Sequence, residues 1–282
     1  YSAWKRWRDG VDWDAHLDME SFALLPLIRR NLQTIGNDDP LFPRFKGIAR
    51  QAWLMNQQLI GRLQQAMETL SNQSVELLLL PPWVYLIRDS SAVLDRSQPL
   101  GFNVRPEQIQ TALRCMLNQG WRVNGVKPPG WAVDGYALGA RYLLMEHPDR
   151  PSLIFYQDLN WWSPNGIDSV WHSATCAHLG KQKIRVPGAA DTLSFELRRP
   201  DVTPSFTTLV ALLRGITSTA DKAELNKRLA SEPPVAAWSE ALEQVQPLFS
   251  SLGLTDFAEV DLEASGCTRA RRLSPLRRLA QD

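Results

Sequence analysis

The sequence predicts an α/β (α+β) protein, in which a small mixed β-sheet is flanked by helices from both ends of the chain. Three observations support this fold class. Apolar residues keep helical spacing in the first quarter, short continuous apolar runs typical of strands follow, and helical spacing returns after about residue 190. We therefore expect a helical region over 1–73, a mixed α/β core over 74–190, and a helical region with a basic tail over 191–282.

In the N-terminal region, one set of apolar residues steps by three or four positions and so shares one helix face. These residues are Ile48, Ala52, Met55, Leu59, Leu63, Ala66 and Leu70. The cluster Gly-Asn-Asp-Asp-Pro at 36–40 is typical of a turn. It should end one helix and start the next.

The middle region carries the strand signals. Apolar runs at 77–80 and 100–104 predict two buried strands, with one or two helical turns over 83–87 between them. A helix should start near Pro106 and end at Gly120. Runs at 141–147 and 152–159 around Pro-Asp-Arg-Pro predict an antiparallel hairpin. The expected buried positions are Leu77, Leu79, Leu100, Phe102, Leu144 and Ile154.

Helical spacing marks three segments of the C-terminal region, 206–213, 222–229 and 236–252, with a break at Pro233-Pro234. The tail alternates arginine and leucine, which suits either docking on an acidic partner or anionic surface, or a solvated amphipathic end. Its residues are Arg269, Arg271, Arg272, Leu273, Leu276, Arg277, Arg278 and Leu279.

Charge and composition narrow the function classes. Lys and Arg total 31 against 30 Asp and Glu, so a net charge of +1 provides no overall attraction to nucleic acid. The longest apolar run, Val75–Ile87, is too short to span a bilayer, and the chain starts without a signal-peptide pattern. Cys115, Cys176 and Cys267 are widely spaced, which favours a reducing compartment. We expect a cytoplasmic protein with no membrane span and no nucleic-acid partner.

Several strings, taken in order over roughly the first 200 residues, resemble a known family. They are SFALLPLIRRNL, LFPRFKGIARQAWLMNQQLIGRLQQAMETL, VELLLL, GFNVRPEQIQTALRCMLNQGW and YQDLNWW, followed by PGAADTLSFEL. They resemble the uncharacterised bacterial nucleotidyltransferase-like proteins, which have the nucleotidyltransferase fold. In that family the first strand ends in Lys-Gly, the next carries Asp-x-Asp, and a later one carries Asp-x-His-Trp.

The chemistry of nucleotidyl transfer explains the carboxylates and the glycine of these motifs. Two carboxylates one residue apart on a strand point to the same face and can share the Mg²⁺ that neutralises a triphosphate. A glycine after the first strand leaves backbone N–H groups free to hold phosphate.

This chain departs from the pattern at both places. Pro81 and Pro82 match the Lys-Gly position, and proline has neither an N–H group nor access to positive φ. Pro99 and Gly101 match the two aspartates of the second strand. The prolines have a second explanation, since prolines often end a buried strand.

Of the three acidic positions, the resemblance leaves Asp158, while Asn160 replaces the histidine. We expect a protein that has lost catalysis, keeps Asp158 as a relic, binds no metal or cofactor, and binds or regulates a protein partner. The alternative is an active Mg²⁺-dependent nucleotidyltransferase that takes its ligands from Asp158, Asp95 and Glu146.

Two other patterns bear on function. His172, Cys176 and His178 could supply three zinc ligands with Cys267 as a fourth, but the paired Cys-x-x-Cys spacing of closed zinc sites is missing. Among the 11 tryptophans, Trp53 and Trp121 are assigned to the core. Six near segment ends are candidates for an exposed interface: Trp4, Trp7, Trp83, Trp131, Trp161 and Trp162.

Overall fold

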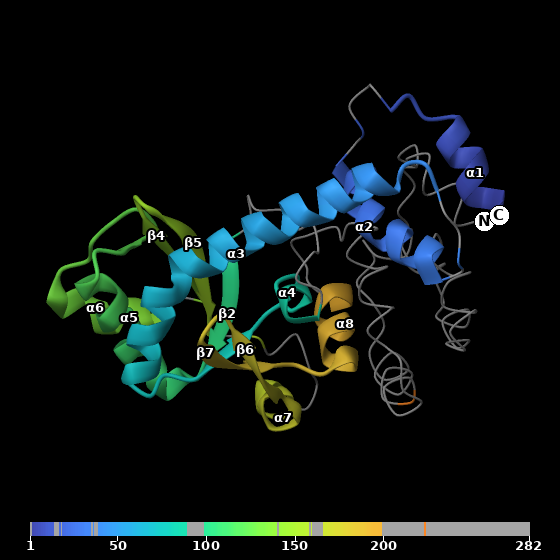
Figure 1. Ribbon diagram of the computed structural model, residues 1–282. Coiled ribbons are helices and arrows are strands. Elements are labelled where there is room, and N and C mark those ends of the chain that lie inside the picture. The colour runs from blue at the N-terminus through green and yellow to red at the C-terminus, as the bar shows by residue number, and fades with distance from the viewer. Residues whose placement is uncertain are drawn as a thin grey trace, which may run out of the picture. The chain divides into compact units, whose positions relative to one another are not determined.

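The computed structural model describes residues 2–13, 17, 19–34, 36, 39–88, 99–139, 141–157, 159, 166–198 and 223. These residues form a mixed α/β fold, which confirms the predicted fold class (Figure 1). The predicted helices at 206–213, 222–229 and 236–252, and the basic tail, lie outside the described residues apart from residue 223.

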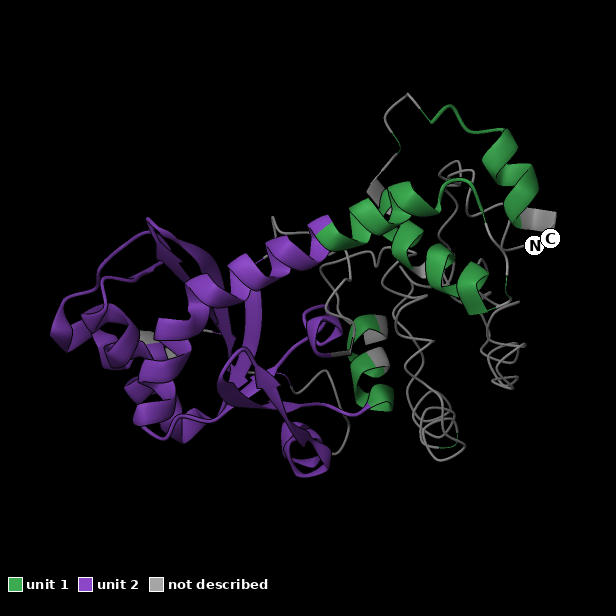
Figure 2. Ribbon diagram, in the orientation of Figure 1, with its two compact units in different colours: residues 1–50, 189–282 green, residues 51–188 purple. Residues whose placement is uncertain are grey.

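The chain forms two compact units, one of residues 1–50 and 189–282 and the other of residues 51–188 (Figure 2). Helix α3 (Phe42–Asn72) begins in the first unit and ends in the second. No helix among the described residues combines the length and the apolar character needed to cross a membrane.

The first unit contains α1 (Ser2–Asp9), α2 (Met19–Thr34), the start of α3 and α8 (Ala189–Arg198). Helices α2 and α3 are separated at the predicted turn, where Gly36 has a φ of 69°. An aromatic cluster joins α1 to α3, with the Trp4 ring 5.3 Å from Trp7 and 5.6 Å from Phe45. All three side chains are buried and form part of the core of this unit.

The second unit is built on a seven-stranded sheet with the order β3-β4-β5-β2-β1-β7-β6. The strands are β1 (Leu77–Leu79), β2 (Leu100–Val104), β3 (Arg122–Val123), β4 (Tyr142–His147), β5 (Arg150–Tyr156), β6 (Thr175–Leu179) and β7 (Gln182–Val186). Its other helices are α4 (Tyr85–Arg88), α5 (Ile109–Asn118), α6 (Val133–Gly139), α7 (Gly166–Ser173) and the 3-10 turns η1 (Pro106–Gln108) and η2 (Gly130–Ala132).

Strand directions make the sheet mixed. Strand β2 runs antiparallel to β1 and parallel to β5, and β1 runs parallel to β7. The β4–β5 hairpin confirms the prediction, as do the helix η1–α5 and Gly120, whose φ is 87°. A second hairpin, β6–β7, turns at Gly180 and was not predicted.

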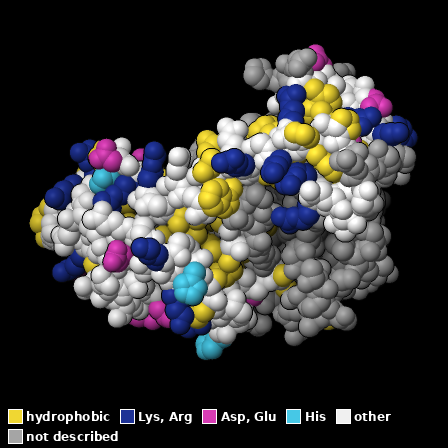
Figure 3. Space-filling model, viewed as in Figure 1, with side chains coloured by type: hydrophobic (Ala, Val, Ile, Leu, Met, Phe, Trp, Pro, Cys, Tyr) yellow, Lys and Arg dark blue, Asp and Glu magenta, His cyan; other side chains and the backbone are white. Residues whose placement is uncertain are grey.

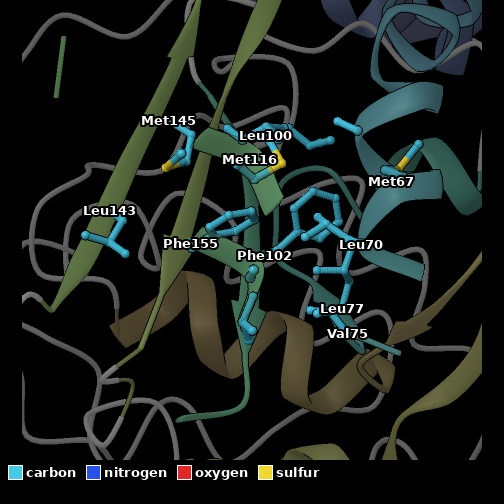
Figure 4. Close-up of a cluster of buried hydrophobic side chains, with 14 of the residues drawn as sticks. Met67, Leu70, Val75, Leu77, Leu100, Phe102, Met116, Leu143, Met145 and Phe155 are labelled. Atoms are coloured by element: carbon cyan, nitrogen blue, oxygen red, sulfur yellow. The ribbon is translucent and has the colours of Figure 1, made fainter. Parts of the chain in front are cut away.

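The main core lies on one face of the sheet, between the strands and helices α3 and α5 (Figure 1). Figure 4 shows part of it, with Leu100 and Phe102 of β2 near Phe155 of β5 and Met67 and Leu70 of α3. The predicted burial of Leu77, Leu79, Leu100 and Phe102 is confirmed.

The predicted burial of Leu144 and Ile154 is wrong. Both side chains are half-buried on the opposite face, while Leu143, Met145, Leu153 and Phe155 are buried in the core. Alternate residues of a strand point to opposite faces, so an error of one position exchanges the two sets.

The tryptophans also correct the sequence analysis. Trp4, Trp7 and Trp83 belong to the core, because these residues are only 8%, 5% and 2% exposed. Trp121 is buried as expected, but Trp53 is 43% exposed. Trp131 is 86% exposed and remains a candidate for an interface, whereas Trp161 and Trp162 lie outside the described residues.

Candidate functional site

Three neighbouring strands, β5, β2 and β1, bring together the positions that the sequence analysis matched to nucleotide-binding and metal-binding residues. Because β1 and β2 are antiparallel, the end of β1 meets the start of β2. Leu79 pairs with Phe102, and the Leu80 N–H donates to the Gly101 carbonyl at 3.0 Å. The segment that matches the phosphate loop therefore begins beside the segment that matches Asp-x-Asp. We call this region the strand-end site, formed by residues 80–83, 99–101 and Ile154.

In the turn after β1, backbone N–H groups donate to carbonyl groups of the same turn. Pro81 is buried and Pro82 is half-buried, and neither has an N–H group. The Trp83 N–H donates to the Leu80 carbonyl at 3.1 Å, and the Tyr85 N–H donates to the Pro82 carbonyl at 3.1 Å. The N–H groups of Trp83 and Tyr85 already donate to carbonyls of the turn, so they are not available to a phosphate group.

The side chain of Trp83 lies against the start of β2. Its ring is 2% exposed, and its Nε1 donates to the Pro99 carbonyl at 2.8 Å. Pro99 is the residue that matches the family's first aspartate. An indole N–H thus joins the turn to the strand at this point.

The space in front of Gly101 is filled with carbon atoms. A Cβ atom at this position would lie 3.4 Å from Leu80 Cβ, 3.5 Å from Ile154 Cγ2 and 3.6 Å from Tyr156 Cε2. These are ordinary van der Waals distances, so a methyl group fits in contact with three carbon atoms. A buried carboxylate needs water, a cation or hydrogen-bond donors around it, and the three atoms nearest to this position are all carbon.

The third acidic position cannot be placed, because Asp158 and Asn160 lie outside the described residues. The register of β2 and β5 is clear up to Tyr156, which pairs with Asn103. In that register Ile154 is the β5 residue that pairs with Gly101. The β5 neighbour of Gly101 in this register is therefore apolar.

Asn103, one pleat beyond Gly101, is a buried polar residue that the sequence analysis missed. Its side chain is almost fully buried, its Nδ2 donates to the Tyr156 carbonyl at 2.8 Å, and its Oδ1 accepts from Trp171 Nε1 at 2.6 Å. The signal was present as one amide within the apolar strand LGFNV. Asn103 holds helix α7 against the same face of the sheet as Gly101.

Charged side chains border this contact. The Arg105 guanidinium lies 4.6 Å from the Trp171 ring centroid, 3.7 Å from a Glu76 oxygen and 3.6 Å from an Asp168 oxygen. Arg185 reaches Glu76 at 3.5 Å. These pairs are partly exposed, so each contributes little to stability. Their arrangement supports a structural role around α7.

The other proposed ligands do not gather at the strand-end site. Glu146 is on β4, which β5 separates from β2, and its Oε2 lies 3.6 Å from the position a Cβ would take at Gly125. Asp95 lies outside the described residues.

The candidate zinc ligands lie on two elements, His172 on α7 and Cys176 and His178 on β6. His172, Cys176 and His178 are exposed, and His172 Nδ1 is 2.7 Å from the Asp168 carbonyl. Cys267 lies outside the described residues. Within the described part of the chain, no group of three His, Cys, Asp or Glu side chains is placed to hold a metal ion.

Comparison with models of known protein families gives no match, and comparison with curated proteins gives none either. The resemblance to nucleotidyltransferase-like proteins therefore remains a prediction that depends on the strings quoted above.

Proposed function

We propose that this chain is a nucleotidyltransferase-fold protein that has lost catalysis and acts by binding or regulating a protein partner. The observation that carries the proposal is the packing at Gly101. Where an active member would hold a metal-binding aspartate, this chain has a glycine in contact distance of Leu80, Ile154 and Tyr156. Metal-dependent transfer requires carboxylates at this point, since the metal neutralises the triphosphate.

The turn after β1 supports the same proposal. Its prolines have no N–H groups, and the N–H groups of Leu80 and Trp83 are bonded within the protein. The buried Trp83 ring and its bond to the Pro99 carbonyl replace a phosphate-binding loop with a packed one. In this proposal, the residues at the phosphate-loop position are part of the protein core and do not bind a ligand.

Exposed apolar side chains support a protein partner. In the second unit Trp131 is 86% exposed, Val126 is 55% exposed and Tyr142 is 52% exposed. Exposed tryptophan and tyrosine are enriched at protein interfaces, where they contribute much of the binding energy. Trp131 is the side chain we expect to matter most for partner binding.

The active alternative would need Mg²⁺ and a set of acids such as Asp158, Asp95 and Glu146. Among the described residues no observation favours it, because Glu146 is two strands away from β2. Strand β5 lies between Glu146 on β4 and Gly101 on β2.

A thermal-shift experiment on the full chain tests the proposal. The protein is heated with each nucleoside triphosphate, with Mg²⁺ and with EDTA. A ligand at one hundred times its Kd stabilises the native state by about 2.7 kcal/mol, which would raise the melting temperature measurably. We expect no shift that depends on Mg²⁺. A Mg²⁺-dependent shift that is lost in Asp158→Ala would support the active alternative instead.

A further inference from the structure

The described part of the first unit contains a pocket of about 590 Å³ between α2 and the start of α3. Its polar lining is Arg29 and Gln33 of α2, with Asp39 and Lys46, and its apolar lining is Pro40, Phe42 and Pro43. The volume falls within the range of small-molecule sites, which is roughly 300–1,000 Å³. The pocket is formed within one unit and is separate from the residues of the strand-end site.

Two cations and an amide line this pocket. Among the residues that the structure describes, Arg29, Gln33 and Lys46 make no side-chain hydrogen bond or ion pair. Figure 3 shows Lys and Arg side chains gathered over α2 and the start of α3. An unpaired guanidinium and ammonium facing one pocket provide charge and donors for an anion.

Among the described residues that line the pocket, the acid is Asp39, and its carboxylate is bonded to other groups. Asp39 is buried, its Oδ2 accepts from Trp4 Nε1 at 2.6 Å and from Arg8 at 3.1 Å, and its Oδ1 accepts from the Leu41 N–H at 3.0 Å. Arg8 shares its charge between Asp39 at 3.1 Å and Asp9 at 2.8 Å. Arg29 and Lys46 are two cations against the single Asp39 charge in the described lining. The pocket therefore carries a net positive charge.

We propose that this pocket binds a small organic anion, whose phosphate or carboxylate group is held by Arg29, Lys46 and Gln33. The apolar part of the ligand would lie against Phe42 and the prolines at 40 and 43. Arginine binds both anions through two parallel N–H donors, and lysine adds a point charge. Binding needs no metal, since the cations come from the protein.

Calorimetric titration of the full chain in EDTA tests this site. The probes are phenyl phosphate, benzoate and inorganic phosphate, so that the phosphate and carboxylate sources are distinguished and the contribution of the apolar body is measured. We expect saturable binding of phenyl phosphate or benzoate, weaker binding of inorganic phosphate, and a loss of affinity as salt is raised. Absence of saturable binding of the two aromatic probes up to about 10 mM would overturn the proposal.

Matched variants locate the binding. Arg29→Gln/Lys46→Gln should weaken it at least about tenfold, and each single variant should weaken it about threefold. Arg62→Gln is the control, because Arg62 is an exposed cation 16 residues beyond Lys46 on α3, about 24 Å along the helix. It should leave the affinity unchanged. Equal affinities in the wild type and both single variants, with unchanged melting temperatures, would contradict the assignment.

Discussion

Placing an aspartate at residue 101 should destabilise this protein, although the active enzymes that the sequence resembles would need one there. The contacts of the added Cβ, at 3.4–3.6 Å from three carbon atoms, allow a methyl group without strain. Gly101→Ala should therefore change the free energy of unfolding by less than about 1 kcal/mol, since alanine also lowers the entropy of the unfolded chain.

The carboxylate of Gly101→Asp extends beyond that methyl position, between Leu80, Ile154 and Tyr156. A buried carboxylate without donors or a cation costs several kcal/mol, limited by its ability to take up a proton. We expect Asp to be less stable than Ala by about 3 kcal/mol, with Gly101→Asn between them because its side chain is neutral.

Urea denaturation at several pH values measures these differences. Burial should raise the pKa of the introduced Asp in the folded state. Its penalty should then be largest at neutral pH and shrink as pH falls toward the pKa of the unfolded chain, about 4. The Asp and Asn variants should converge in acid. An Asp variant as stable as the Ala variant at pH 7, or one stabilised by Mg²⁺, would refute the packed-site interpretation.

Three further predictions concern single side chains. Asn103→Ala should destabilise the second unit by about 2–3 kcal/mol in urea denaturation, because it leaves the buried Trp171 N–H unpaired; a cost below about 0.5 kcal/mol would contradict this. Burial alone would raise the pKa of Asp39, but the hydrogen bonds from Trp4 and Leu41 and the Arg8 charge hold that pKa below its usual value. Asp39 should therefore stabilise the protein above about pH 4, and this contribution should be lost as pH falls through the lowered pKa, so that Asp39→Asn shows a weaker acid dependence of stability than the wild type. Asp158→Ala should change stability by about 1 kcal/mol and leave partner binding intact, and loss of binding in a pull-down with an identified partner would contradict its role as a relic.

The strand pattern could be predicted where a strand is buried on both faces, because no choice between the two faces is then needed. Strands 77–80 and 100–104 are continuous apolar runs, and both are buried on two faces. In β4 and β5 apolar residues occupy both faces, so alternation could not decide between Leu143 and Leu144. The β6–β7 hairpin had a usable signal, because Gly180-Lys181 separates two alternating runs, TCAHL and QKIRV.

The strand-end site could be predicted only in part. The resemblance predicts that proline and glycine stand at positions 81, 82, 99 and 101, where the nucleotidyltransferase-like proteins have Lys-Gly and two aspartates. It does not reveal that Leu80, Ile154 and Tyr156 surround Gly101, because these contacts join three strands that lie far apart along the chain. The burial of Trp83 and the pairing of Asn103 with Trp171 depend on the same long-range packing.

Calorimetric titration of the full chain with ATP, in Mg²⁺ and in EDTA, tests the loss of metal-dependent nucleotide binding most directly. The comparison should include Arg29→Gln/Lys46→Gln, so that any binding of the phosphates in the pocket of the first unit is removed. We predict no Mg²⁺-dependent heat of binding in either protein, because the strand-end site offers neither free N–H donors after β1 nor a carboxylate at residues 99 and 101. Saturable binding that requires Mg²⁺, persists in the double variant and is abolished by Asp158→Ala would contradict the account.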